Sequence, residues 1–513
     1  VKLLFVLKKL LKFPLPAILM ALTKKLTTID RVAIVVIILL SFVLSGLVLG
    51  EQVCGTDCWY KAKARVRNFS WAEEDVSASD RAFMLEFSRP MNQESVENNL
   101  RIQPELAGKF SWSGKRMAYT LENPAPYGTE YQLTLNGAKD RLGSEIKPLE
   151  TTFKTRDRVF VYLGAKGDEK GRLISYNLTQ QQKEILTPPH LIVNKFVSYP
   201  KRDRILFSAI SEEDWQQGKL DQQLYTVTTG CNEEAAPSGQ ITLILDNKRY
   251  QILDFELSPD GEKIVVRRAP KNDLRQTSLW LIKADEETPQ PLKTEQGGEF
   301  IIPPDSNTLA LAQGQGIALI PLEEDSNPSN FLPQYGQVLT FSSDGSAAAM
   351  VDFNTEDPNQ LYTRSLYVVT NRGTEKKLLD TNGSILRCEF SPSVTNLYCL
   401  ITQLVDVEEY REQPYLVSIN LDNETITPLL TLPEDQDIEM SLSPDGLAIL
   451  FDQTMTVSDP PKDVPSLDND SGEAIIDSRL WLLVPTPTLT QDPTQQPKLE
   501  ELPLSGLAPL WLP

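Results

Sequence analysis

The chain has 513 residues, of which 50 are Lys or Arg and 70 are Asp or Glu, so its formal net charge at pH 7 is −20. This acidic balance argues against a nucleic-acid-binding protein, because a negative surface repels the phosphate backbone. The one histidine, His190, leaves no conventional zinc site, and the sequence contains neither a G-x-S-x-G nucleophile turn nor a phosphate-binding P-loop. We therefore expect no catalytic residue and no resident cofactor.

Residues 32–50 form a run of 19 uncharged residues. As a helix this run would span roughly 28 Å, close to the hydrocarbon thickness of a membrane. Residues 1–31 carry seven Lys or Arg and one Asp, which by the positive-inside rule places them in the cytoplasm. The sequence predicts a single transmembrane helix over residues 32–50, with the bulk of the chain outside the cytoplasm. A cleaved signal peptide is the alternative, although no A-x-A-like site is evident.

The two segments that flank this run differ in character. Residues 1–31 are basic and apolar, and they either lie on the inner membrane surface or form a loosely ordered cytoplasmic tail. Residues 51–63 form a juxtamembrane linker. Its Cys54 and Cys58 could form a local disulfide, hold a metal with outside ligands or stay reduced, and the lack of a second ligand pair argues against a metal.

Residues 64–156 have the pattern of a β-sandwich. Apolar and polar residues alternate over Ala82 to Phe87 and over Tyr131 to Leu135, as in half-buried antiparallel strands. Because the segment contains no cysteine, its sheets must be held together by packing alone.

Residues 157–513 repeat one phrase, in which an apolar strand leads into a Ser-Pro-Asp-Gly turn and a second apolar strand follows. In such a turn Pro fixes φ at the second position, Asp tolerates the bridge region, and Gly supplies a positive φ. A third strand and a more polar fourth strand complete each unit, as in the blades of a β-propeller. The clear copies are Ser258–Gly261 and Ser443–Gly446, and the decayed copies are Ser342–Gly345, Ser391–Ser393, Pro303–Ser306 and Ser198–Pro200.

Neither end of this repeat region is a complete unit. The segment that begins at Val159 lacks a first strand, whereas Ala508 to Pro513 resembles a first strand and nothing more. Joined in one sheet, the two fragments would make one further blade and hide the open edges. We therefore expect an all-β chain with an N-terminal transmembrane helix, an Ig-like sandwich and a seven-bladed propeller whose last blade is closed by both ends of the domain.

Two family resemblances support this division. The repeats look like those of TolB-type propellers, and residues 64–156 resemble a bacterial Ig-like domain of the surface-layer SbsA type. The second resemblance is carried by Phe87–Asn92, Tyr127–Leu133, Gly137–Gly143 and Thr152–Thr155. Together with the predicted membrane helix, the two resemblances indicate an envelope protein of the bacterial inner membrane whose bulk is periplasmic. TolB has six blades, so the expected seventh departs from that family's pattern.

Three of the five cysteines lie in the repeat region. Pairing Ser391 with Asn396 across a hairpin places Cys388 opposite Cys399, and a disulfide can form there if the pair is a non-hydrogen-bonded one. Cys231 is left without an evident partner.

Carboxylates recur two or four residues before the turns, at Asp254, Glu256, Glu299, Glu389 and Glu439. Positions two apart in a strand point the same way, so these side chains could line an acidic channel that holds a divalent cation or a basic peptide terminus. The alternative is that they only keep a central hole hydrated. The acidic run Asp468–Glu473 is interpreted as a solvated loop, because its Gly falls one place too early for a calcium loop.

Three classes of function remain open. The leading hypothesis is a non-catalytic envelope protein that binds protein or glycan through its propeller, tethered to the membrane by residues 32–50. The second is a propeller enzyme that acts on carbohydrate or peptide with paired carboxylates. The third is a sensor ectodomain that works with a membrane partner.

Overall fold

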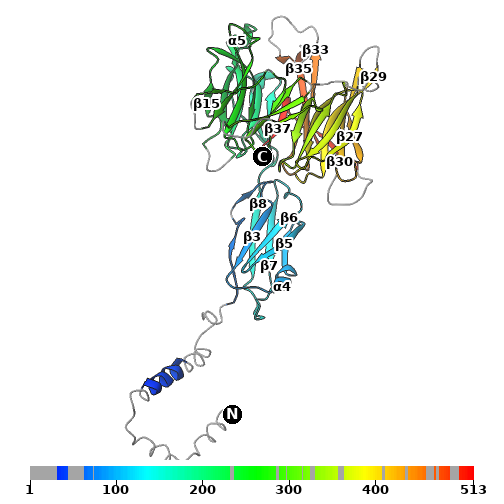
Figure 1. The fold of residues 1–513 in the computed structure, drawn as a ribbon. Coiled ribbons are helices and arrows are strands. Elements are labelled where there is room, and N and C mark those ends of the chain that lie inside the picture. The colour runs from blue at the N-terminus through cyan, green and yellow to red at the C-terminus, as the bar shows by residue number, and fades with distance from the viewer. Residues whose placement is uncertain are drawn as a thin grey trace, which may run out of the picture.

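The computed structural model describes residues 32–43, 63–72, 74–231, 236–284, 288–295, 297–314, 316–323, 330–355, 363–406, 411–433, 437–457, 467–468, 473–485 and 496–513. Apart from four short helical segments, the regular structure of these residues is β-sheet (Figure 1). The helical segments are residues 32–43, α4 (Gln93–Glu97), the 3-10 turn η2 (Gly167–Glu169) and α5 (Glu212–Gln216).

The first body is a sandwich of two four-stranded sheets. One sheet has the order β1-β3-β6-β5 and the other β2-β8-β7-β4. The strands are β1 (Val66–Phe69), β2 (Asp75–Val76), β3 (Ala82–Phe87), β4 (Leu100–Gln103), β5 (Gly108–Ser113), β6 (Arg116–Leu121), β7 (Glu130–Leu135) and β8 (Leu149–Thr155).

Aromatic rings from both sheets fill the space between them. Phe69 meets Phe83 edge-on at 5.4 Å and Phe153 of the other sheet at 5.9 Å. In β3 and β7 alternate residues are buried, as the sequence predicts. Packing of these rings holds the two sheets together.

The second body, here called the repeat region, contains seven sheets. Six consist of strands consecutive in the chain and the seventh joins strands from both ends of the region. The sheet with strands from both ends has the order β11-β10-β9-β37, where β9 is Val159–Gly164, β10 is Leu173–Asn177, β11 is Gln182–Ile185 and β37 is Gly506–Trp511. Five sheets have four strands in chain order: β12 (Leu191–Ser198), β13 (Arg204–Ser211), β14 (Gln223–Thr228) and β15 (Ile241–Leu245); β16 (Tyr250–Leu257), β17 (Lys263–Pro270), β18 (Ser278–Lys283) and β19 (Gln290–Pro291); β20 (Phe300–Ile301), β21 (Thr308–Gln313), β22 (Gly316–Pro321) and β23 (Asn330–Leu332); β24 (Gln337–Phe341), β25 (Ala347–Asp352), β26 (Arg364–Thr370) and β27 (Glu375–Thr381); and β28 (Ile385–Phe390), β29 (Asn396–Asp406), β30 (Arg411–Asn420) and β31 (Ile426–Thr431). The last sheet has the order β32-β33-β35-β34, with β36 also paired to β35, where β32 is Met440–Leu442, β33 is Ile449–Val457, β34 is Leu467–Asp468, β35 is Ala474–Val484 and β36 is Lys498–Glu501.

Burial within a sheet follows the position of the strand. The second strands, such as β13, β17 and β25, are buried along almost their whole length, whereas β11, β19 and β36 at the fourth position are exposed. A strand covered on both faces needs a continuous apolar run, which is what these second strands have.

Every predicted turn between a first and a second strand is present, although the one predicted at Ser198–Pro200 runs from Tyr199 to Arg202, one residue later. In each, the amide of the fourth residue donates to the carbonyl of the first and the fourth residue has a positive φ, of 76° at Gly261 and 75° at Gly446. The Ser and Asp side chains complete the turn. The Ser443 hydroxyl donates to Asp445 at 2.5 Å, and Asp445 Oδ1 accepts from the amide of Leu447 at 3.1 Å.

Turns of successive sheets also touch one another. A Cβ placed on Gly446 would lie 2.7 Å from Cδ of Pro392 in the preceding turn, and one on Gly261 would lie 3.0 Å from Cδ of Pro200. Glycine is therefore needed twice, for the positive φ and for the close approach of the neighbouring turn.

The sandwich packs against the turn side of the repeat region. The Tyr127 amide donates to Asp445 Oδ2 at 2.9 Å, and Arg81 Nη1 donates to the Pro392 carbonyl at 3.3 Å. Figure 1 shows the sandwich and β37 on either side of this junction.

The predicted membrane anchor needs correction. Among the described residues no helix is both long and apolar enough to cross a membrane. The structure describes residues 32–43 of the apolar run as a helix, and residues 44–50 lie outside the described residues. For the part of the chain that the structure describes, the transmembrane helix over residues 32–50 and the single-pass inner-membrane localisation are therefore wrong.

The predicted closed propeller is corrected as well. The sheets are open, and in the described residues no backbone ladder joins one sheet to the next. Side chains make these connections instead, since single apolar clusters contain residues of neighbouring sheets. Strand β37 does pair antiparallel with β9, so one sheet contains strands from both ends of the region.

The contact between turns predicts unequal costs for two glycine substitutions. Gly373 has a φ of 77° and nothing within 4 Å of the position that a Cβ would take, whereas Gly446 has a φ of 75° and Pro392 at 2.7 Å. Gly373→Ala should cost about 1–2 kcal/mol from backbone strain alone. Gly446→Ala should cost a further ~1–3 kcal/mol from overpacking, measured as free energy of unfolding in urea. Equal losses in the two variants would show that the turns do not constrain one another.

Candidate functional site

The first strands of the sheets carry the predicted carboxylates. Five of these strands have a bulge, for example between Val193 and Lys195, between Ile252 and Asp254, and between Ile385 and Arg387. A bulge bends the strand and re-aims the side chains that follow it. Lys195, Asp254 and Arg387 come directly after a bulge, and ion pairs join Lys195 and Arg387 to carboxylates of the next sheet.

One half of the resulting cluster is centred on Lys195. Its Nζ lies 2.8 Å from Asp254 Oδ1 and 3.1 Å from Glu256 Oε1 on the first strand of the next sheet. Burial raises the pKa of Glu256, and Lys195 only partly opposes this effect. Burial alone would lower the pKa of Lys195, but the two carboxylates outweigh it and raise that pKa.

The other half is centred on Arg387. Its Nε lies 3.6 Å from Glu389 Oε1, and its Nη1 donates to Glu439 on the next sheet. The amide of Leu442 also donates to Glu389 at 3.0 Å. Burial raises the pKa of Glu389, and Arg387 opposes this rise.

The two halves form one electrostatic unit. Glu256 and Arg387 influence each other although their sheets are separated by two others in the sequence. We call the six residues the charged cluster: Lys195, Asp254, Glu256, Arg387, Glu389 and Glu439. Their side chains are between 25% and 50% exposed, so water reaches them. With every group ionised, the four carboxylates exceed the two cations by two charges.

The predicted acidic site is thus only partly acidic. Four of its five carboxylates belong to the charged cluster, while Glu299 accepts a hydrogen bond from Gln337 at 2.6 Å. In the described parts of the chain, no three His, Cys, Asp or Glu side chains come together to hold a metal ion. Lys195 and Arg387 lie where a cation bound by these carboxylates would otherwise lie.

Sequence reasoning missed these two cations. Lys195 and Arg387 lie four residues before the first residue of their turns, the same position as Asp254, Glu299 and Glu439. Counting both signs of charge at that position would have found them.

The predicted disulfide is present. Cys388 and Cys399 are bonded, their Cα atoms lie 4.1 Å apart, and both side chains are buried. Cys388 lies between Arg387 and Glu389, so the disulfide joins β28 to β29 at the charged cluster.

The other predicted residues lie elsewhere. Cys231 is free, and its Sγ lies 3.8 Å from the Thr229 carbonyl. His190 is exposed. Cys54, Cys58 and residues 469–472 of the acidic loop lie outside the described residues.

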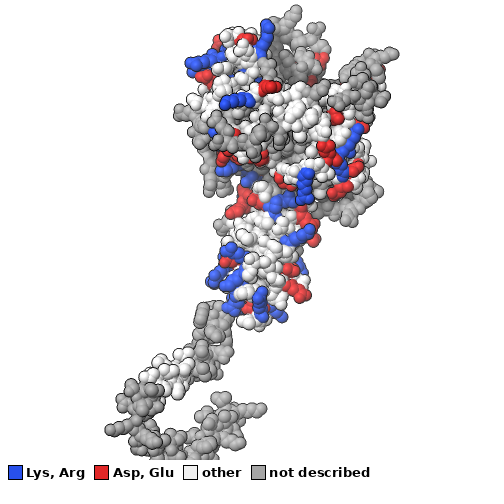
Figure 2. Space-filling model, viewed as in Figure 1, with Lys and Arg blue, Asp and Glu red and all other residues white. Residues whose placement is uncertain are grey.

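Negative charge is concentrated in the repeat region. Residues 157–513 contain 28 Lys or Arg and 54 Asp or Glu, whereas residues 64–156 contain 13 of each class. Figure 2 shows both signs of charge on the visible face of the sandwich. The excess acidity therefore belongs to the body that carries the charged cluster.

The chain was compared with known proteins. No protein-family model matches it, and no curated protein sequence matches it significantly. The resemblance to SbsA-type Ig-like domains is therefore without support from a family match.

Solved structures of similar fold include TolB-like β-propeller proteins. TolB from Acinetobacter baumannii is 9% identical, with 81% of this chain and 83% of that chain covered and a TM-score of 0.40. An oligogalacturonate lyase from Vibrio parahaemolyticus is 12% identical, with 58% and 88% covered and a TM-score of 0.41. Hydrazine synthase from Kuenenia stuttgartiensis is 13% identical, with 59% and 79% covered and a TM-score of 0.39. At these scores we draw no functional argument from the similarity.

The Arg387 contacts predict a pH-dependent loss of stability. Arg387→Gln leaves Glu389 and Glu439 without their cation, and because the Arg387 side chain is 41% exposed we expect a loss of only about 1–2 kcal/mol at about pH 8. Without Arg387 the folded-state pKa of Glu389 rises further above its unfolded value. A carboxyl group whose pKa is higher in the folded than in the unfolded state stabilises the fold at pH values below its unfolded pKa, which is about 4.3 for Glu. That stabilisation is lost as pH rises through the folded-state pKa. The loss should therefore shrink toward about pH 5, as measured by urea denaturation at both pH values.

The control is Arg116→Gln on the sandwich, whose side chain is 61% exposed and lies 3.7 Å from Glu86. It should change the free energy of unfolding by less than about 0.5 kcal/mol at either pH. A loss in Arg387→Gln that does not depend on pH would contradict the assigned electrostatics.

Removal of the disulfide should destabilise the repeat region. The bond closes a loop with a sequence separation of 11 residues, so Cys388→Ala with Cys399→Ala should cost about 2–4 kcal/mol. Cys231→Ala, which removes a thiol with no disulfide, is the matched control and should cost less. Urea midpoints that fall by the same amount in both variants would count against a stabilising role for the bond.

Proposed function

We propose that this chain is a non-catalytic binding protein whose repeat region recognises a polypeptide partner. The charged cluster would receive a positively charged group of that partner, and exposed apolar side chains at the ends of the sheets away from the sandwich would supply contact area. The sandwich, which we propose to be Ig-like, would support the repeat region.

The carrying observation is the distribution of exposed apolar side chains. Large apolar residues are exposed at the connections between second and third strands of five sheets. They are Leu220, Leu274, Phe353, Val405, Met455 and Ile476. In an antiparallel sheet this connection lies at the end opposite the first turn, so these residues lie on the side away from the sandwich. Aliphatic side chains of this kind favour contact with protein over contact with glycan.

Electrostatics favours a cationic partner group. The charged cluster has two more carboxylates than cations, and the whole repeat region has nearly twice as many acidic as basic residues. Such a surface attracts basic faces at long range and repels acidic ones.

An enzyme with paired carboxylates is the weaker proposal. Asp254 and Glu256 are a pair of the required type, but both bind Lys195 Nζ, at 2.8 Å and 3.1 Å. The ammonium group lies between the two carboxylates, where the reacting oxygen of a substrate would need to be placed.

The test is in-cell crosslinking followed by affinity purification of the full chain. Glu256→Gln with Glu439→Gln, and separately Leu220→Ser with Leu274→Ser, should each lower the recovery of a specific partner at least about tenfold, equivalent to ~1.4 kcal/mol.

The matched controls lie on the sandwich: Glu145→Gln for charge and Leu142→Ser, at an 86% exposed side chain, for apolar area. Both should leave recovery unchanged. Equal losses in the controls, or no loss in the cluster variants, would refute recognition through this side of the repeat region.

A further inference from the structure

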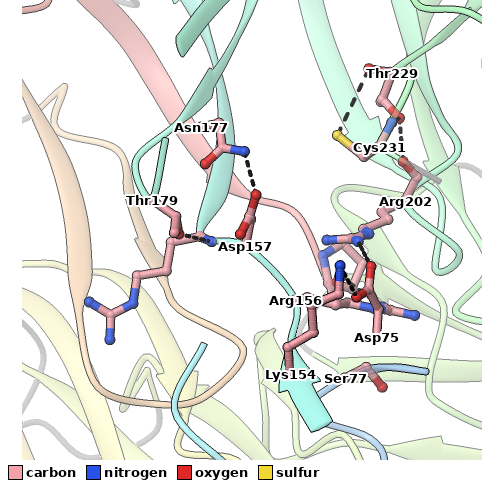
Figure 3. Close-up of polar contacts among 12 residues, drawn as sticks. Asp75, Ser77, Lys154, Arg156, Asp157, Asn177, Thr179, Arg202, Thr229 and Cys231 are labelled. Carbon is pink, nitrogen blue, oxygen red and sulfur yellow. Dashed lines mark hydrogen bonds and ion pairs between the residues drawn. The ribbon is translucent and has the colours of Figure 1, made fainter. Parts of the chain in front are cut away.

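The contacts between sandwich and repeat region converge on a few neighbouring sheets. The Tyr127 amide binds Asp445, Arg81 binds the Pro392 carbonyl, and Arg156 Nη1 donates to the Pro513 carbonyl at 3.1 Å. Arg202 Nη2 lies 3.8 Å from Asp75 Oδ2 (Figure 3). The repeat-region partners belong to the β28–β29, β32–β33 and β12–β13 turns and to the residues after β37.

The sheet at the middle of this group differs from the others. Its β9 and β37 are more than 300 residues apart in the chain, whereas the remaining sheets consist of consecutive strands. Holding distant segments together costs more chain entropy than closing a local hairpin. The ladder between β9 and β37 is interrupted between Leu507 and Leu510, where Ala508 has a φ of 48°. Because its two strands are so far apart in the chain, the β9–β37 junction has the highest chain-entropy cost among the pairings within the seven sheets.

The sandwich contacts this sheet on one side, and the first two residues of the repeat region contact it on the other. On one side Arg156 reaches the carbonyl of Pro513, two residues beyond β37. On the other side Asp157 accepts from Asn177 at 2.8 Å and from Gln180 at 2.6 Å, and the Arg158 amide donates to Thr179 at 2.8 Å. Asn177 is the last residue of β10, and Thr179 and Gln180 lie in the connection between β10 and β11; Figure 3 shows the contacts of Asn177 and Thr179.

Arg156 is itself fixed within the sandwich. Its amide donates to the Val76 carbonyl at 3.0 Å, and its carbonyl accepts from the Gly128 amide at 2.7 Å. Since the backbone is held in place, only the rotamer freedom of the Arg156 side chain is lost when it binds Pro513.

Charged side chains of the sandwich and of the repeat region meet at this junction. Arg202 is buried, and burial together with the nearby Arg156 lowers its pKa, while Asp75 opposes this effect. Lys154 Nζ lies 3.1 Å from the other oxygen of Asp75. The Asp75 carboxylate of the sandwich thus pairs with Lys154 of the sandwich and with Arg202 of the repeat region.

From this geometry we infer that the sandwich is a clamp that keeps β37 paired with β9, and not merely a spacer that carries the repeat region. This role is independent of any partner of the charged cluster. It predicts that weakening the sandwich contacts opens the β9–β37 junction before it affects the other sheets.

Hydrogen–deuterium exchange of the full chain tests the inference. Arg156→Met keeps the length of the side chain but removes its donors, and it should raise amide exchange in residues 159–164 and 506–512 at least about tenfold, while exchange in β21 and β22 changes less than about twofold. Arg116→Met, at an exposed position elsewhere on the sandwich, is the control and should change neither set. Unchanged exchange at the junction, or an equal rise in β21 and β22, would overturn the inference.

A crosslinked variant distinguishes opening of the β9–β37 junction from a general loss of stability. Leu163 and Leu507 are directly paired between β9 and β37. Leu163→Cys with Leu507→Cys, joined by a disulfide that is verified by mass spectrometry, should reduce the effect of Arg156→Met on residues 506–512 to less than about twofold. If Arg156→Met raises exchange equally with and without the crosslink, the sandwich does not act through this pairing.

Discussion

The turn between first and second strands is the constraint on which the repeat region depends. Its Ser and Asp side chains satisfy the turn's own amides, and its last residue must adopt a positive φ. In Gly261 and Gly446 that residue also meets the proline of the preceding turn. A turn of this kind fixes two things at once, the reversal of the chain and the distance to the neighbouring sheet. The first strands therefore approach one another at a spacing that the bulges then adjust.

This close approach brings charged side chains of neighbouring first strands together, and in the charged cluster they pair with one another. Side chains that follow the bulges point into a shared, partly hydrated space, where an unpaired charge would be costly. Lys195 binds two carboxylates of the next sheet, whereas Arg387 binds Glu389 of its own strand and Glu439 of the next sheet, so most of the compensation crosses between sheets. Burial still raises the pKa of Glu256 and of Glu389, which shows that compensation is incomplete. A cationic group from outside would complete it.

Local chemistry was readable from the sequence, and spatial arrangement was not. The turns, the strands around them and the Cys388–Cys399 pairing depend on residues close in the chain, where φ preferences and alternation act directly. The cations of the cluster were missed because only carboxylates were counted at a position that Lys195 and Arg387 share. The membrane helix was inferred from apolar length and flanking charge, whereas no helix of the described residues is long and apolar enough to cross a membrane. Nothing local to Arg156 indicated that its side chain would reach Pro513, 357 residues away.

The decayed turns show how one local motif acquires a second use. Arg202, Ser306 and Val394 hold the place of the glycine and have φ values of 50°, 56° and 56°, a strained region for residues with a Cβ. In two of them the side chain makes a contact that glycine could not make. Arg202 lies against Asp75 of the sandwich, and the Ser306 hydroxyl accepts from the Asp260 amide at 3.1 Å. Asp445 shows the same double use in an intact turn, since one of its oxygens closes the turn and the other binds the Tyr127 amide. The sandwich is thus attached through the same turns that set the spacing of the sheets.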